Sequence, residues 1–141
     1  MEHTFVRKEG KWKGHGILID EDKLESIVEC RYVISAGEKW RLACEMSKRE
    51  GGKKVIESEL EFAPPQSGPE YVEWKRAGDG IKGRFMVAGD TIVSSYEKQG
   101  REGESGLEFY AKVNDECYMD RGAVFRDGNM VRCWVVELTA G

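Results

Sequence analysis

Apolar and polar residues alternate with a period of two along most of this chain, and no long window places apolar residues at helical spacing. Residues 39–47 show the pattern most clearly: the even-numbered positions from Trp40 to Met46 are apolar, and the odd-numbered positions are mostly charged. Residues 55–62 repeat it, with Glu57, Glu59 and Glu61 on the polar face. A strand with one buried and one wet face produces this alternation, so the sequence predicts an all-β fold.

Glycine, asparagine and aspartate punctuate the pattern into ten segments joined mostly by two-residue turns such as Gly89-Asp90 and Asp127-Gly128. Short turns predict sequential antiparallel hairpins, and closing such a meander removes its two free edges. We therefore expect one domain over residues 1–141, a single closed antiparallel up-and-down β-barrel of 8 to 10 strands, lipocalin-like. The expected strands lie near residues 11–19, 26–35, 38–48, 54–63, 70–76, 81–88, 91–98, 106–113, 116–126 and 129–138.

Two longer connections interrupt the rhythm and are expected to be rim loops. Residues 63–69 contain three prolines and should form a rigid, extended connection, and residues 97–105 form a polar, glycine-rich loop. Residues 20–23 are a candidate for one helical turn, but the sequence contains no helical lid. The loop at 64–69 is also a candidate contact for a protein partner.

Charge and cysteine usage narrow the classes of function. Lys plus Arg number 22 against 26 Asp plus Glu, which gives a net charge of −4, and no basic stripe with interleaved aromatic residues occurs, so we expect no nucleic-acid partner. No apolar run is long enough for a membrane span or a signal peptide, which predicts a cytoplasmic protein, monomeric or homodimeric, without a membrane partner. The four cysteines are far apart and are interpreted as reduced thiols.

The apolar faces predict which side chains point into the barrel. Aromatic residues and methionine dominate this set, which suits an adaptable apolar pocket, although the same side chains would equally fill a solid core. The candidate ligand-binding side chains among them are Tyr32, Trp40, Trp74, Phe85, Phe109 and Met119.

The strand at 116–126 permits two orientations. With Cys117, Met119 and Phe125 inside, Arg121 is also inside and becomes an anchor for an anionic ligand group. With the opposite face inside, Tyr118 and Asp120 point inward instead. Asp120 with Tyr110 or Tyr118 is then a candidate acid and base pair, because burial raises a carboxyl pKa.

Histidine is too scarce to support other chemistry. The only two histidines, His3 and His15, lie near the N-terminus, so no Ser-His-Asp set can be assembled. His15 has no second ligand at metal-binding spacing, and we expect neither a metal nor a cofactor. The sequence thus favours a protein without catalytic activity.

Gly10-Lys11-Trp12 at the start of the first strand, with Arg132 on the last, resembles the calycin superfamily, which includes lipocalins and fatty-acid-binding proteins. The resemblance implies that Trp12 closes the barrel floor beneath a late arginine, either Arg132 or Arg121. Trp12-Lys13-Gly14-His15-Gly16 also resembles the opening of nitrobindin-like barrels, but the late histidine that would bind heme is missing. Gly14 and Gly16 are expected to let the strand bend. A further resemblance is to the barrel-shaped phycobilin lyases.

These observations predict an intracellular barrel that binds a small hydrophobic or amphipathic molecule in its interior, with Arg121 or Arg132 at the polar end of the ligand. Two alternatives stay open. One is a barrel lyase or isomerase, including a phycobilin-lyase-like enzyme, that uses Asp120 and a tyrosine. The other is a non-catalytic barrel that acts through a protein partner and exposes an apolar patch.

Overall fold

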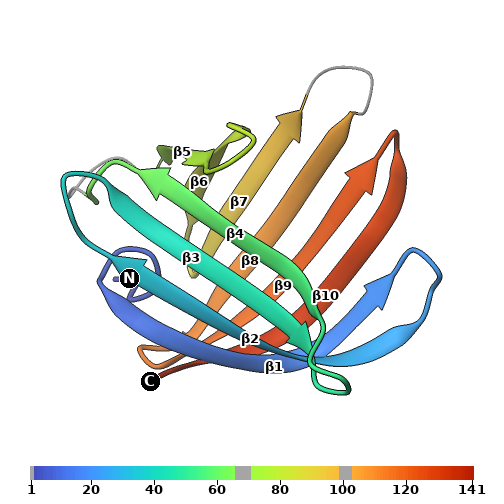
Figure 1. Cartoon of the computed structure of the whole chain (residues 1–141). Coiled ribbons are helices and arrows are strands. Elements are labelled where there is room, and N and C mark those ends of the chain that lie inside the picture. The colour runs from blue at the N-terminus through green and yellow to red at the C-terminus, as the bar shows by residue number, and fades with distance from the viewer. Residues whose placement is uncertain (1, 66–70, 99–102) are drawn as a thin grey trace.

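Ten antiparallel strands form one closed barrel, in which each strand pairs with its sequence neighbours and β1 pairs with β10 (Figure 1). The structure is a computed structural model and describes residues 2–65, 71–98 and 103–141. The strands are β1 (Gly10–Asp20), β2 (Glu25–Ser35), β3 (Trp40–Lys48), β4 (Lys54–Phe62), β5 (Tyr71–Arg76), β6 (Lys82–Ala88), β7 (Thr91–Lys98), β8 (Glu104–Asn114), β9 (Cys117–Arg126) and β10 (Asn129–Ala140).

The predicted all-β, up-and-down barrel is confirmed, and the strands lie close to their expected positions. Asp127 and Gly128 both have positive φ, 51° and 81°, as the tight hairpin between β9 and β10 requires. Residues 20–23 form a hairpin turn, in which the Lys23 amide donates to the Asp20 carbonyl at 2.9 Å, so the suggested helical turn is wrong. The described residues contain no helix that could span a membrane.

The two long connections are only partly described. Residues 66–70, which hold most of the proline-rich loop and the expected start of the fifth strand, lie outside the described residues, as do residues 99–102. The expected loop at 97–105 is shorter than predicted, because Glu97 pairs with Ser105 and Lys98 with Glu104 as a continuation of β7 and β8.

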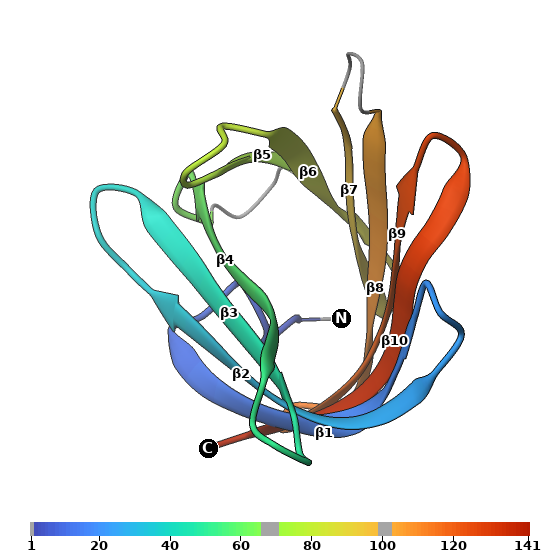
Figure 2. The same ribbon diagram turned by 45° about the vertical axis from the view of Figure 1, so that its right-hand side comes forward.

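One end of the barrel is filled by an N-terminal plug, residues 3–6, which Figure 2 shows between the walls of the barrel. Phe5 is fully buried and packs at ring distances of 4.7–5.6 Å against four aromatic residues of the wall: Trp12, Tyr32, Tyr110 and Tyr118. His3 donates from Nε2 to the Gly89 carbonyl at 2.9 Å, and its Nδ1 lies 2.8 Å from the Tyr118 hydroxyl. We call this the closed end.

The ring of strands is weakest between β4 and β5. Only three residue pairs join these strands, from Leu60–Arg76 to Phe62–Trp74, whereas nine join β1 to β10. The first half of β4, residues 54–58, therefore has no partner on β5. This unpaired segment lies at the opposite end of the barrel from the plug, which we call the open end.

Candidate functional site

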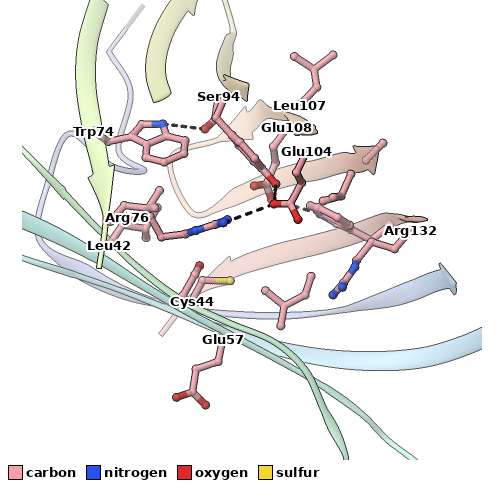
Figure 3. Close-up of a pocket in the computed structure, with 18 of the residues that line it drawn as sticks. Leu42, Cys44, Glu57, Trp74, Arg76, Ser94, Glu104, Leu107, Glu108 and Arg132 are labelled. Atoms are coloured by element: carbon pink, nitrogen blue, oxygen red, sulfur yellow. Dashed lines mark hydrogen bonds and ion pairs between the residues drawn. The ribbon is translucent and has the colours of Figure 1, made fainter. Parts of the chain in front are cut away.

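A cavity of about 400 Å³ occupies the open half of the barrel. Side chains from every strand except β1 and β6 line it, and Figure 3 shows many of them around the central space. The volume lies within the range of small-molecule sites in proteins. The interior is thus a solid core at one end and a pocket at the other, which answers the question that the apolar faces left open.

Three cavity-facing aromatic residues stand directly opposite glycines on the neighbouring strand. A Cβ atom on any of these glycines would come within 2.1–2.2 Å of the partner's ring, which real side chains do not tolerate. Each ring therefore lies flat over its glycine against the barrel wall, where a larger partner would push it into the cavity. The pairs are Trp74 with Gly83, Tyr96 with Gly106 and Trp134 with Gly122.

Two acidic side chains form the floor of the cavity. Asp120 is completely buried, and Glu108 on β8 lies between it and the cavity. The Tyr32 hydroxyl donates to Asp120 Oδ2 at 2.7 Å and lies 3.3 Å from Glu108 Oε2. The Trp134 indole N–H donates to Glu108 Oε2 at 3.2 Å and lies 3.4 Å from Asp120 Oδ1. Four strands, β2, β8, β9 and β10, therefore meet in one hydrogen-bonded group.

This arrangement raises the pKa of Asp120 well above its ordinary value. Burial is the main cause, followed by the charge of Glu108 and a hydrogen bond to it, while the bonds from Tyr32 and Trp134 act in the opposite direction. Asp120 therefore tends to keep its proton, and Glu108 is the member of the pair that faces the cavity. Such a floor accepts N–H or cationic groups from a ligand, or delivers a proton.

Burial makes the other titratable groups of the floor poor nucleophiles. It raises the pKa of Tyr32 and Tyr110 well above 10, and that of the Cys44 thiol well above 9. The pKa of Cys30 rises to about 12 for the same reason, with Asp120 as a further cause. Thiolate chemistry at this floor is disfavoured, since the reactive form of a cysteine is the thiolate.

Charged residues surround the mouth of the cavity. Arg76 donates to Asp79 at 2.6 Å and to Glu104 at 3.4 Å, and its guanidinium lies 5.2 Å from the Tyr96 ring centroid. The Tyr96 hydroxyl in turn donates to Glu104 at 2.8 Å. Burial, together with Glu104, raises the pKa of Tyr96 to about 12. Arg76 is thereby held in place and largely neutralised by its carboxylate partners.

Arg132 differs from Arg76 because its described partner is a carbonyl. Its Nη1 donates to the carbonyl of Val55 at 2.7 Å, on the unpaired segment of β4, and the strands that carry these residues are not neighbours in the barrel. Arg132 therefore spans the mouth, and no salt bridge between described residues involves it. Its positive charge remains available to an anionic group of a ligand.

The structure places the predicted interior residues in three environments. Tyr32, Trp74 and Arg132 line the cavity. Phe85 belongs to the packed core, where its ring lies 5.4 Å from that of Phe62. Trp40 is half-buried and packs on the edge of that core.

The expected inward positions of Phe109, Met119 and Arg121 are wrong. Phe109 is 40% exposed and Arg121 is exposed, whereas the alternating neighbours Tyr110 and Asp120 are buried. The second orientation considered for β9 is therefore the observed one, with Tyr118 and Asp120 inside. Arg121 cannot contact a ligand in the interior from the outer face.

The candidate tyrosines separate along the barrel. Tyr110 lines the cavity and stands opposite Asp120 in the β8–β9 register. Tyr118 lies at the closed end, where its hydroxyl accepts the Thr4 amide at 3.1 Å and contacts His3. The position of Tyr118 thus disfavours an acid and base pair of Asp120 with Tyr118. The residue that shares hydrogen-bond partners with Asp120 is Glu108.

Trp12 is buried at the closed end, but neither predicted arginine covers it. Arg132 stands opposite Asp20 at the far end of β1, and Arg121 points outward. Trp12 instead meets Phe5 and Tyr118 edge to face, each at 5.5 Å. The floor is therefore closed by aromatic packing with the N-terminal plug.

The glycines of β1 serve close packing. A Cβ on Gly14 would lie 2.4–2.7 Å from the side chains of Cys30, Val136 and Leu138, and one on Gly16 would lie 2.0 Å from the Val135 carbonyl oxygen. The two glycines thus let β1 approach its neighbours. His15 between them is exposed, and the described residues contain no cluster that could hold a metal ion.

Sequence reasoning missed Glu108, Arg76 and the N-terminal plug. Glu108 alternates with the apolar Leu107 and Phe109, so the pattern placed it on the wet face. Arg76 ends a strand and reads as a surface charge. His3 and Phe5 precede the first alternating segment, and only the presence of an isolated aromatic residue there could have pointed to packing.

No family model matches this sequence, and no curated protein matches it. Among solved structures, the barrel is similar to the S-type phycobiliprotein lyase CPES of Guillardia theta, with a TM-score of 0.69 at 12% identity over 97% of this chain and 90% of that chain. It is also similar to Rv2717c of M. tuberculosis, with a TM-score of 0.65 at 14% identity over 94% of this chain and 92% of that chain. At these identities the likeness shows a shared fold, and the resemblance to calycin barrels is confirmed at that level.

Proposed function

We propose that the barrel binds a small, flat, amphipathic molecule in the cavity of its open half. The observation that carries this proposal is the combination of about 400 Å³ of space with an acidic, hydrogen-bonded floor and aromatic walls. A solid core, the main alternative for such an interior, leaves no room of this size.

The shape of the walls supports a flat ligand. The rings of Trp74, Tyr96 and Trp134 are held against the wall by their glycine partners, so they offer planar faces to a guest. Aromatic faces bind conjugated rings by stacking and cations through their quadrupole. We expect a molecule with a conjugated or aromatic body.

The polar groups support an oriented ligand. Glu108 at the floor accepts N–H or cationic groups, and Arg132 at the mouth meets an anionic group. A ligand with an N–H-bearing body and an acidic tail satisfies both. The predicted role of Arg132 at the polar end of the ligand is retained in this proposal, whereas Arg121 has none.

Native mass spectrometry of the protein purified without denaturation tests for a retained molecule. As a second test, tryptophan fluorescence should report binding of 2-naphthylmethylamine, a flat probe with a cationic group, since Trp74 and Trp134 line the cavity. Unchanged fluorescence with this probe, together with a mass equal to that of the bare chain, would contradict the proposal.

Matched variants locate the site. Glu108→Gln should weaken binding of the amine by about tenfold or more, because it removes the charged acceptor at the floor. Glu57→Gln is the control, since Glu57 also lines the cavity but is exposed at its mouth (Figure 3). Equal affinities in the two variants would show that the probe binds elsewhere.

A second candidate function is a lyase or isomerase, favoured by the raised pKa of the buried Asp120. Its proton would pass to a ligand through Glu108, which separates it from the cavity. Asp120→Asn should then abolish turnover of the substrate while leaving its affinity within a few fold. Unchanged turnover in this variant would exclude the acid role.

A further inference from the structure

The outer wall of the barrel has two contrasting halves. On β3 and β4 the outward side chains are charged and paired, for example Arg41 with Glu59 at 3.6 Å and Lys54 with Glu45 at 3.6 Å. On β6 to β10, β1 and β2, a row of directly opposed outward residues runs across the strands. This apolar belt consists of Met86, Val93, Phe109, Val135, Ile17 and Ile27, with Arg121 between Phe109 and Val135.

The belt exposes large apolar side chains to water. Phe109, Val135, Ile17, Ile27 and Met86 are 40–54% exposed. The neighbouring outward positions add further apolar side chains, because Met119 and Leu107 also lie on this wall. Contiguous exposed apolar surface of this kind marks an interaction site.

Two charges on the belt's central strands indicate what covers it. Arg121 on β9 and Glu137 on β10 both point outward at diagonal positions in the register, where Arg121 opposes Val135 and Glu137 opposes Met119. No salt bridge between described residues includes either charge. Arg121 and Glu137 thus occupy opposite corners of a four-residue block whose other two corners are Met119 and Val135, so this block is complementary to itself.

We propose that β8, β9, β10 and β1 form a two-fold homodimer interface through this belt. A two-fold axis lying in the contact plane along the Met119–Val135 line brings Arg121 of one copy opposite Glu137 of the other, twice. The residues on the axis, Met119 and Val135, then meet their own copies in an apolar centre. The interface thus has an apolar core and a pair of symmetric ion pairs.

The size of the wall fits this occupant. A standard interface takes roughly 800 Å² and about 20 residues from each partner, which is near a tenth of the 8595 Å² surface of this chain. The outward residues of β8, β9, β10 and β1 together supply about that number. The cavity mouth stays clear, since the interior faces of these strands are not involved.

Sedimentation equilibrium of the full chain tests the proposal through a charge swap. We expect a dimer in the wild type. Arg121→Glu and Glu137→Arg should each weaken dimerisation by about tenfold or more, because like charges then face each other across the axis. The double variant R121E/E137R should restore the dimer to within about threefold, since it re-forms the same pairs with reversed sign.

Arg41→Glu is the matched control, because it makes the same charge change on the charged half of the wall, and its dimerisation should be unchanged. Circular dichroism should show all variants folded, as the substituted side chains are exposed. A wild type that is monomeric at about 100 µM, a hundredfold above a micromolar Kd, would overturn the proposal. So would a dimer that both single variants leave intact, or one that the double variant fails to restore.

Discussion

The two ends of the barrel are built from the same strands, but one end is filled with side chains and the other holds a cavity. At the closed end, Phe5, Tyr118 and Leu138 fill the space between the walls and are fully buried. At the open end, glycines stand opposite Trp134 and Tyr96, and the space remains empty. A cavity in a small barrel is thus created by removing side chains from the wall as much as by widening the barrel.

Matched leucine truncations give the largest expected difference between the ends. Leu138→Ala should lower the free energy of unfolding by about 3–5 kcal/mol, because it opens a new cavity in a filled region. Leu60→Ala should cost only about 1–2 kcal/mol, because Leu60 already borders the cavity and is half-buried. Urea unfolding of the two variants measures both values, and equal costs would contradict a hollow open end.

Filling a glycine position should cost somewhat less. In Gly122→Ala the new Cβ would lie 2.2 Å from the Trp134 ring, so the ring must shift into the cavity. We expect a loss of about 1–3 kcal/mol, measured by urea unfolding, and weaker binding of a flat probe. Gly10→Ala is the control: its Cβ meets nothing nearer than 3.7 Å and should change stability by less than about 0.5 kcal/mol.

The acid at the cavity floor should make stability depend on pH. Burial and the charge of Glu108 raise the pKa of Asp120 in the folded protein, so above its ordinary value of 3.8 the folded state binds more protons than the unfolded chain. Stability is then lost as the pH rises towards the folded pKa, by up to about 1.4 kcal/mol per pH unit.

Asp120→Asn removes this loss. Relative to wild type, the variant should therefore become progressively more stable as the pH rises above 3.8, with the difference constant below that pH. Urea unfolding of both proteins across this range measures the difference. A difference that does not change with pH would mean that Asp120 titrates normally.

The smallest effect is expected outside the barrel. Arg41 and Glu59 form an ion pair at 3.6 Å with both side chains about half exposed. Arg41→Ala should change stability by less than about 1 kcal/mol, and by less still in high salt. A larger loss of unfolding free energy, measured with urea, would show that the outer ion pairs also contribute to the difference in stability between regions of the barrel.

Alternation was enough to predict the strands and several interior faces, because each half-buried strand separates its polar and apolar residues. Leu42 and Met46 on β3 are examples, and both are buried. It failed on β8 and β9, where Phe109 lies on an apolar outer face and Glu108 lies inside. Around a cavity, inward positions are no longer uniformly apolar and large, because the cavity floor needs polar side chains and its walls need glycine.

The rest of the site depends on contacts between distant segments. The N-terminal plug packs against Tyr118, more than a hundred residues away, and Arg132 reaches Val55 across the mouth. Neither contact leaves a periodic trace in the sequence. Residue type indicated that Arg132 was a candidate anchor, but its partner could be found only from the fold.

The pairing of β1 with β10 has a consequence for how the protein is made. These two strands join at nine residue pairs, yet they are the first and last strands along the chain. During synthesis the ribosome releases the other strands before β10 exists, so β1 has an exposed edge for the whole of that time. The barrel can close only after translation of its last strand, and until then the growing chain is a substrate for chaperones and a template for strand exchange with other chains.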